Sequence, residues 1–265
     1  MATVNEIYAQ IDRMAPFATQ MDFDNAGFLV GRGETEVKRL LVALDITEEV
    51  AGEAAELGCQ LIVSHHPVIF HPVKALTDQS VTGRILLALA ENRIAAICAH
   101  TNLDAAQGGV NCCLAQALGL KEIGQLHQDG VDGEGRPYGI GRVGLAHRFG
   151  MSAAEYAAYV KQCLGGASVR CADGGRKVEK VAVGGGSCGS MLADALRAGC
   201  DTFVTADVKY DQFLQAKAMG ITLMDAGHFP TENVVCAPLA QALAEQFPAV
   251  EVFLSKRHKE AFLEA

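Results

Sequence analysis

The stretch Leu61-Ile62-Val63-Ser64-His65-His66-Pro67 decides the expected fold. It begins with a short apolar run without alternation, which is typical of a buried parallel strand. Pro67 has no backbone N–H to donate inside a sheet, so we expect the strand to end at the two histidines. Open α/β sheets bind ligands at the carboxyl ends of their strands. The stretch therefore predicts a parallel α/β sheet with His65 and His66 beside a site. Taken alone, such a pair is more typical of one packed and one solvated imidazole than of a site, and the rest of the chain changes that balance.

Composition and charge exclude several classes of protein. The chain has 265 residues, of which 50% are hydrophobic and 20% charged, enough for one large or two small domains with a sizeable core. A net charge of -9 argues against non-specific nucleic-acid binding and against an anionic membrane surface. The N-terminus lacks a signal-peptide pattern, and no apolar run approaches membrane-spanning length. Nine cysteines without a C-x-x-C pair indicate reduced thiols. We therefore expect a cytoplasmic protein without a membrane or nucleic-acid partner.

Two further strands are expected to end in similar polar groups. The apolar run 94–99 leads into His100-Thr101-Asn102-Leu103-Asp104, and the run 221–224 leads into a segment that contains Gly227-His228-Phe229-Pro230-Thr231-Glu232. In both segments a carboxylate follows a histidine four residues later. The three predicted strand tips therefore supply His65, His66, His100, Asp104, His228 and Glu232.

The chain also contains an internal repeat with an offset of 141 residues. Residues 37–66 align without a gap on 178–207, and both copies read strand, loop, helix, Gly-Cys, strand. A polar, Gly-rich segment over 125–141 is expected to be a linker or surface hairpin between the halves. We predict two pseudo-symmetric α/β domains, residues 1–125 and 126–265, with mainly parallel sheets whose strand ends face a shared crevice. The identical pairs are Val37/Val178, Val42/Val183, Ala54/Ala195, Gly58/Gly199, Cys59/Cys200 and Val63/Val204.

The residue types at the three tips point to a metal site. Mixed imidazole and carboxylate ligands suit zinc, iron, manganese or nickel. A carboxylate can bridge two ions through its two oxygens, and such a pair makes a nucleophile from water at neutral pH. The alternative for His100 and His228 is a role in helix capping or in a loop. The other histidines, His71, His127, His147 and His258, are expected at the surface.

Several polar features remain open at this level. The glycine loop 184–189 precedes a helix, so its amides could hold an anion, or it could be a tight turn. Asp207 and Lys209 could line the crevice or simply start a helix. Asp24-Asn25 could form a turn or lie near the site.

Helix signals are clear in two places. Ser152 and Glu155 form a capping-box pattern that predicts a helix over 152–164. Thr231 is a good N-cap for a helix reaching Phe247, with a kink expected at Pro238.

Five segments together resemble one known family. They are Ser64-His65-His66-Pro67 with Phe70, His100-Thr101-Asn102-Leu103-Asp104, Gly227-His228-Phe229-Pro230-Thr231-Glu232, Asp24-Asn25 with Gly27 and Gly31, and Gly184-Gly185-Gly186-Ser187. The chain is similar to the Nif-three-like (NGG-interacting-factor-three-like) dinuclear metal centre proteins, which often carry the label GTP cyclohydrolase I type II. The resemblance spans nearly the whole chain and implies the Nif-three-like fold of two related α/β domains.

The resemblance also implies a ligand set and an assembly. His65, His66, Asp104, His228 and Glu232 would bind two divalent ions per subunit, with Glu232 as a bridge. His100 matches a motif position and would be either a ligand or a residue behind the ligands. Members of the family are typically toroidal homohexamers. Ala206, Asp211 and Thr231 stand where the family often has Gly, His and Ser, so a substrate contact at Asp211 is in doubt.

Two functions agree with these patterns. The first is a metal-dependent hydrolase acting on a nucleotide or a related phosphorylated small molecule, with His100 as a candidate catalytic proton carrier. Ring opening of GTP is the specific activity that the family label suggests, although no residue pattern here recognises guanine. The alternative is a non-catalytic metal-binding oligomer that acts as a metal chaperone or regulator.

Overall fold

Two compact units make up the protein in the computed structural model, which describes residues 2–166 and 168–263. Unit 1 comprises the chain up to Leu103 together with Cys236–Lys259, and unit 2 comprises Asp104–Val235 and the residues from Glu260 on. The expected boundary at residues 125 and 126 falls inside unit 2. There α5 (Val110–Ala117) packs against β10 (Arg142–Leu145) and β12 (Lys180–Val183). Within the described ranges, no helix has the length and apolar character needed to cross a membrane.

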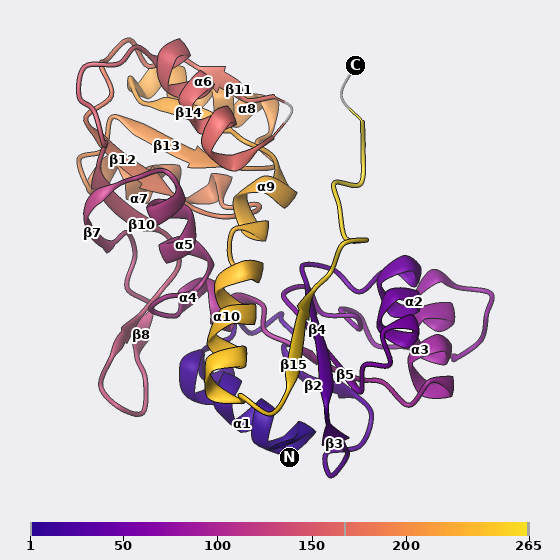
Figure 1. Ribbon diagram of the computed structural model, residues 1–265. Helices are drawn as coiled ribbons and strands as arrows, with labels where there is room; N and C mark the ends of the chain where they lie inside the picture. The colour runs from indigo at the N-terminus through magenta and orange to yellow at the C-terminus, as the bar shows by residue number, and fades with distance from the viewer. Residues whose placement is uncertain (1, 167, 264–265) are drawn as a thin grey trace. The chain divides into compact units, whose positions relative to one another are not determined.

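Unit 1 is built on a five-stranded sheet that is parallel except at one edge (Figure 1). Its strands are hydrogen-bonded in the order β15-β4-β5-β6-β2, and β2 is the antiparallel edge. The expected strand before the histidine pair is β5, and all four of its residues are buried. The bounds are β15 Glu251–Leu254, β4 Arg39–Ala43, β5 Leu61–Ser64, β6 Ala95–Cys98 and β2 Gly27–Val30.

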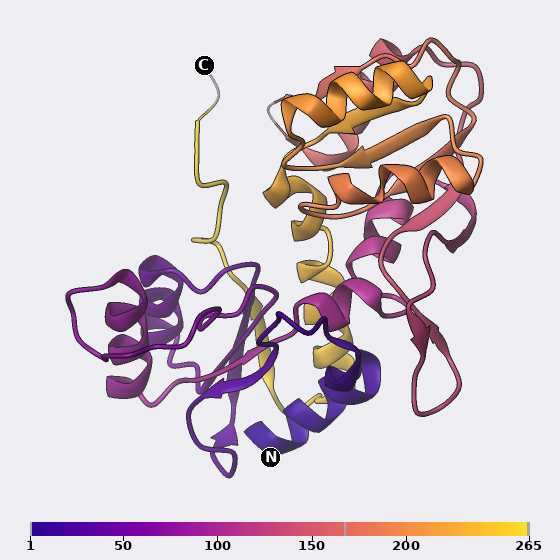
Figure 2. The same cartoon turned by 180° about the vertical axis from the view of Figure 1, so that it is seen from behind.

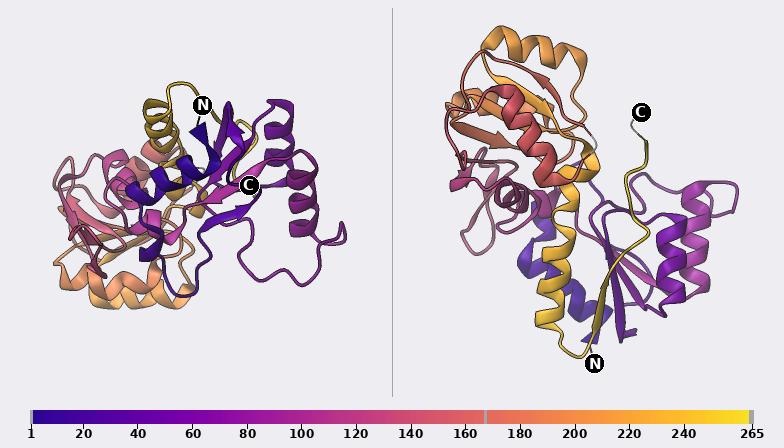
Figure 3. Two further views of the ribbon diagram at one scale, coloured as in Figure 1. Left: turned by 90° about the horizontal axis from the view of Figure 1, so that it is seen from below. Right: turned by 45° about the horizontal axis from the view of Figure 1, so that its top comes forward.

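Helices cover both faces of the unit 1 sheet. α2 (Glu48–Glu56) and α3 (Val81–Glu91) pack on one face, where they meet side chains such as Leu41 and Ile62. α1 (Val4–Met14) and α10 (Cys236–Gln246) lie on the other side of the sheet (Figures 1 and 3). The short elements are β1 (Ala2–Thr3), which pairs with β3 (Glu36–Val37), and the 3-10 turn Phe17–Thr19.

Unit 2 contains a six-stranded mixed sheet whose centre is parallel (Figure 2). The strand order is β11-β14-β13-β12-β10-β7, and β12, β13 and β14 are the parallel strands. The segment 125–141 contains the hairpin β8–β9, in agreement with the expected surface hairpin. The bounds not given above are β7 Lys121–Gln125, β8 Gly130–Val131, β9 Pro137–Tyr138, β11 Arg170–Ala172, β13 Thr202–Thr205 and β14 Thr222–Asp225.

The central strands of unit 2 bury both faces, as their continuous apolar sequences predict. Val204 of β13 packs toward α5 and α6 (Ala153–Leu164), whereas its neighbour Phe203 packs toward α7 (Leu192–Arg197) and α8 (Tyr210–Met219). The 3-10 turn Gly189–Met191 precedes α7. The capping box that begins α6 forms as the sequence predicts.

The internal repeat is present in the sheet registers. Leu40 pairs with Leu61 between β4 and β5, and Val181 pairs with Thr202 between β12 and β13, each shifted by the same offset. Gly58 and Gly199 both follow a helix with positive φ angles of 66° and 75°. The two mixed α/β units thus share a strand-helix-strand core.

The predicted single helix from Thr231 to Phe247 is wrong. Two helices occupy this region, α9 (His228–Asn233) at the end of unit 2 and α10, with which the chain re-enters unit 1 at Cys236. Thr231 lies inside α9, where its hydroxyl accepts a hydrogen bond from the Gly186 amide at 3.1 Å instead of capping the helix. Pro238 is the third residue of α10, where its missing N–H costs no helical hydrogen bond, so no kink is needed there.

Candidate metal centre

The parallel strands of unit 1 bring their carboxyl ends to one edge of the sheet. β4 is followed by Asp45, β5 by His65 and His66, and β6 by His100. β4, β5 and β6 are direct neighbours in register. Residues far apart in the sequence therefore meet at this edge, as the apolar runs predicted.

Three imidazoles form a compact group at the strand ends. The ring centroids are 5.0 Å apart for His65 and His66, 5.2 Å for His65 and His100, and 5.5 Å for His66 and His100. One ring nitrogen from each residue lies within 4.8 Å of the others, so the group could hold a metal ion. His100, expected as a ligand or a residue behind the ligands, is a full member of the group.

The first two histidines are held through the same ring atom. His65 is 1% exposed, and its Nδ1 lies 2.8 Å from the carbonyl oxygen of Ala99. The Nδ1 of His66 lies 2.7 Å from Oδ1 of Asp45. Because both acceptors are oxygens, Nδ1 carries the proton in each ring, and Nε2 is the atom that can coordinate an ion.

His100 follows the same rule with a more deeply buried partner. Its Nδ1 lies 2.7 Å from Oδ1 of Asp24, whose side chain is fully buried. The other oxygen of Asp24 accepts hydrogen bonds from the amide and the hydroxyl of Thr101, at 3.0 and 2.5 Å. Burial raises the pKa of Asp24, but the hydrogen bonds from His100 and Thr101 outweigh it and lower the pKa to about 2. Asp24 therefore holds the ring of His100 in place, in addition to any role in the local turn.

The acidic half of the predicted ligand set lies in unit 2. α9 places His228 and Glu232 one turn apart, with Nε2 3.0 Å from Oε2. Asp104 lies in α4 (Thr101–Ala105), and one of its oxygens is within 4.8 Å of a Glu232 oxygen. Both carboxylates are buried, at 7% and 3% exposure. Burying such a pair is costly without a cation, so this His/Glu cluster could hold a metal ion.

Asp207 orients His228 as Asp45 orients His66. Its Oδ2 lies 2.7 Å from Nδ1 of His228, and its backbone has a φ angle of 50°, which few residues other than glycine adopt. Burial lowers the pKa of His228, but Glu232 and Asp207 outweigh it and raise the pKa to about 9. Without a metal the ring is therefore charged at neutral pH, and metal binding through Nε2 must release a proton.

The glycine loop fits closely around Glu232. The amide of Gly185 donates to the side chain of Asn111 at 2.9 Å, and that of Gly186 donates to Thr231. These two amides serve side chains of the protein, so the loop acts here as a tight turn rather than an anion site. A Cβ on Gly186 would lie 2.0 Å from Oε1 of Glu232, so only glycine leaves room for the carboxylate.

A buried arginine, which was not expected from the sequence patterns, holds the end of α4. Arg142 is 1% exposed, and its guanidinium donates to the carbonyl oxygens of Ala105 and Ala106 at 3.2 and 2.9 Å. It also donates to the carbonyl oxygen of Gly139 at 2.9 Å. These bonds fix the backbone immediately after Asp104.

The remaining histidines and Lys209 are away from these groups. His71, His127 and His147 are exposed, as expected. His258 is only partly exposed, contrary to expectation, because its Nδ1 accepts the amide of Leu44 at 2.8 Å. Lys209 is exposed and precedes α8, which agrees with the simple helix-start interpretation.

The three carboxylates behind the histidines were not identified from the sequence as their partners. Asp45 and Asp207 each follow a strand, at the same edge as the ligands, and Asp24 precedes the edge strand β2. A strand followed directly by an aspartate is the signal that could have suggested Asp45. Nothing local to Asp24 indicates His100 as its partner, because the two are 76 residues apart.

The chain is similar to several known proteins. A GTP cyclohydrolase 1 type 2 homolog from Clostridium perfringens is 34% identical over 261 residues, covering 98% of both chains. A protein of the same name from Streptomyces coelicolor is 36% identical over 250 residues, covering 92% of this chain and 87% of its own. The crystal structure of a Bacillus cereus protein related to NIF3 superimposes with a TM-score of 0.93 at 26% identity, covering 100% and 99% of the two chains. The family model for Duf34/NIF3 (NGG1p interacting factor 3) matches residues 2–261, and the chain therefore belongs to that family.

Proposed function

We propose that the protein is a metal-dependent hydrolase that acts on a nucleotide or a related phosphorylated small molecule. In this proposal two divalent ions are bound by His65, His66, Asp104, His228 and Glu232. The observation that carries it is the shared use of Nδ1. His65, His66 and His228 each present Nδ1 to an oxygen of the protein. Orienting partners of this kind are characteristic of metal-binding histidines.

The donor set fits a pair of ions of intermediate softness. Imidazole nitrogens with carboxylate oxygens suit zinc, iron, manganese or nickel, and a carboxylate such as Glu232 can bridge two ions. Asp104 lies in the short helix α4, which begins directly after His100, so this acid follows the imidazole by four residues along the chain. Bound ions would supply Lewis acidity and a more acidic water.

His100 is proposed as the proton carrier. Asp24 keeps the proton on Nδ1, so Nε2 can accept a proton from water and return it to a leaving group. The burial of Asp24 and its bonds to Thr101 fix the ring direction before substrate arrives. Preorganisation of this kind lowers the cost of reaching the transition state.

The substrate class comes from the names of the relatives. The Clostridium perfringens and Streptomyces coelicolor proteins are both called GTP cyclohydrolase 1 type 2 homologs. We propose by extension that this protein takes a purine nucleotide or a similar phosphorylated molecule. A cytoplasmic location is part of the proposal, because the adjacent free thiols Cys112 and Cys113 suit a reducing compartment.

Turnover and metal content test the proposal together. Metal-loaded protein would be assayed with GTP, other nucleotides and simple phosphoesters, beside Glu232→Gln and the surface control Glu91→Gln. We expect activity in the unaltered protein and the control, with loss of at least 100-fold and a lower metal content in Glu232→Gln.

Two results would contradict the proposed hydrolase. One is activity that Glu232→Gln leaves unchanged. The other is an absence of turnover for every substrate when two ions are bound per chain, a result that would favour the metal chaperone or regulator instead.

A further inference from the structure

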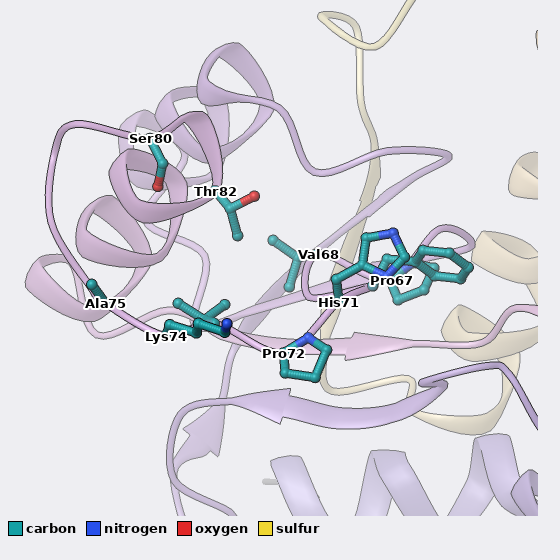
Figure 4. A pocket seen from close by; sticks show the side chains of 10 residues that line it. Pro67, Val68, His71, Pro72, Lys74, Ala75, Ser80 and Thr82 are labelled. Atoms are coloured by element: carbon teal, nitrogen blue, oxygen red, sulfur yellow. The ribbon is translucent and has the colours of Figure 1, made fainter.

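A pocket lies directly beyond the histidine pair in unit 1. Residues of the segment 67–80, which joins β5 to α3, line it together with Thr82 in the first turn of α3, and its volume is about 390 Å³. That volume is within the range of small-molecule sites. In the view of Figure 4, Lys74 and Pro72 lie below Val68 and Thr82.

Phe70 connects the pocket with the imidazole group. Its ring lines the pocket and also meets the ring of His100 edge-on, with centroids 6.1 Å apart and an angle of 86° between the planes. The side-chain amide of Asn25 donates to the carbonyl oxygen of Ile69 at 2.5 Å, which ties the loop to the segment that carries Asp24. A molecule held against Phe70 would therefore border on the imidazoles.

The charge of the pocket is opposite to that of the chain. Lys74 and His71 line it, and none of its described lining residues carries a carboxylate, although the net charge of the chain is -9. Asp78, the one acidic residue between positions 67 and 80, is not part of the lining. The hydroxyl groups of Ser80 and Thr82 also line the pocket. An anionic group is the natural occupant of this end of the pocket.

The aromatic end of the pocket is exposed to solvent. Phe70 is 40% exposed, and Phe23, with its centroid 6.5 Å away, is 64% exposed. The two phenyl rings are 70° apart in orientation, so a planar ring could stack on one of them, and stacking on Phe70 would bury apolar surface that now faces water. The occupant therefore combines a planar ring with an anionic group.

We infer that this pocket binds the phosphate of a ring-bearing phosphorylated substrate, with Lys74 contacting the phosphate and Phe70 contacting the ring. The inference rests on the proposed function for the substrate class, and it adds the residues that recognise the substrate. Phosphate is favoured over a carboxylate because the ammonium of Lys74 has three donors, which can meet several phosphate oxygens.

Direct binding measurements test the inference without requiring turnover. Zinc-loaded protein would be titrated by calorimetry with guanosine and adenosine 5′-monophosphates, with the matching nucleosides, and with inorganic phosphate. The variants are Lys74→Gln and the exposed control Lys38→Gln. We expect Lys74→Gln to weaken nucleotide binding about 10-fold, which corresponds to about 1.4 kcal/mol, with nucleoside binding and metal content unchanged. Lys38→Gln should match the unaltered protein.

Phe70→Leu separates the two ends of the pocket. It should weaken nucleosides and nucleotides equally and leave the binding of inorganic phosphate unchanged. Nucleotide binding that is absent in the unaltered protein, or equal in Lys74→Gln, would overturn the inference.

The failures of the two proposals are distinguishable. Lys74-dependent binding without any turnover would uphold the pocket and reject the hydrolase. Turnover with an unchanged KM in Lys74→Gln would uphold the hydrolase and reject the pocket.

Discussion

Single aspartates decide how the histidines of this protein point. Asp24, Asp45 and Asp207 each lie 2.7 Å from Nδ1 of a different histidine. The environments differ, because the side chain of Asp24 is fully buried whereas those of Asp45 and Asp207 are 46% and 53% exposed. Exposed carboxylates are screened by water, so Asp24 should control its histidine most strongly.

Replacing Asp24 by asparagine should release His100. An amide offers one acceptor oxygen in place of two, so His100 or Thr101 loses its partner. We expect Asp24→Asn to reduce the Nδ1-protonated form of His100 and to destabilise the fold by about 1–3 kcal/mol. Nitrogen-15 NMR of the imidazole would report the protonated atom directly. Asp22→Asn, an exposed neighbour, is the control, and an unchanged His100 spectrum in Asp24→Asn would contradict the assignment.

A methyl group at Gly186 should displace Glu232. The added Cβ would lie 2.0 Å from the carboxylate, and Ala at a φ of 62° costs about 1 kcal/mol in addition. Gly199→Ala carries the same backbone cost at a φ of 75°, but nothing lies within 4 Å of its Cβ. We expect Gly186→Ala to lose more stability than Gly199→Ala, and only Gly186→Ala to lose metal affinity, as measured by competition with a chelator. Equal metal affinities would show that the glycine serves the backbone alone.

At the scale of elements, the strand ends could be predicted and the helices around the acids only in part. The apolar runs before His65 and His100 are local signals, and β5 and β6 form where they indicated. The end of α9 has no such signal. Thr231 is a residue type that often caps helices, but its hydroxyl accepts a hydrogen bond from the amide of Gly186, a residue 45 positions away. A local pattern cannot report a partner at that distance.

The segment after β15 is another element held by distant partners. The carboxylate of Glu53 in α2 accepts the hydroxyl of Ser255 at 2.5 Å and the amide of Lys256 at 2.9 Å, and His258 accepts the amide of Leu44. Burial raises the pKa of Glu53, but these hydrogen bonds lower it below its usual 4.5. Burial lowers the pKa of His258 below 6.5, although the negative charges of Asp45 and Glu53 act to raise it.

Both shifts make this segment sensitive to acid. The stabilisation from neutral His258 is complete above pH 6.5 and is lost as the pH falls toward its folded-state pKa. The stabilisation from the ionised carboxylate of Glu53 is present above pH 4.5 and is lost as the pH falls through the lowered pKa of this group. We expect the amide protection factors of residues 255–258 to fall between pH 7 and pH 5, while those of β5 stay constant. Protection that changes equally in both regions would argue against these anchors.

At the scale of the whole molecule, the repeat was the most informative part of the sequence. It predicted a strand-helix-strand core present twice, and the equal registers of Leu40 with Leu61 and Val181 with Thr202 agree with it. It could not predict the division into units. The chain returns to unit 1 through α10 and β15, whose place beside β4 depends on packing rather than on a repeated motif.

Assembly remains a prediction at this scale. From the family resemblance we expect a homohexamer of the 28.0 kDa chain, with two divalent ions in each subunit. Light scattering coupled to size-exclusion chromatography would give the mass of the particle, and elemental analysis of the same fractions would give the metal content. A monomer at micromolar concentration would reject the hexamer, and one ion per chain would reject the dinuclear centre.

The backbone of Asp207 has a consequence for any attempt to make this protein more heat-resistant. A residue held at a φ of 50° stores strain that glycine would relieve, so Asp207→Gly is a substitution that selection for thermal survival alone would favour. The same substitution removes the oxygen that directs the ring of His228. Heat resistance and the orientation of His228 are thus opposed at one position, and variants selected in the laboratory for heat resistance alone would tend to lose that orientation.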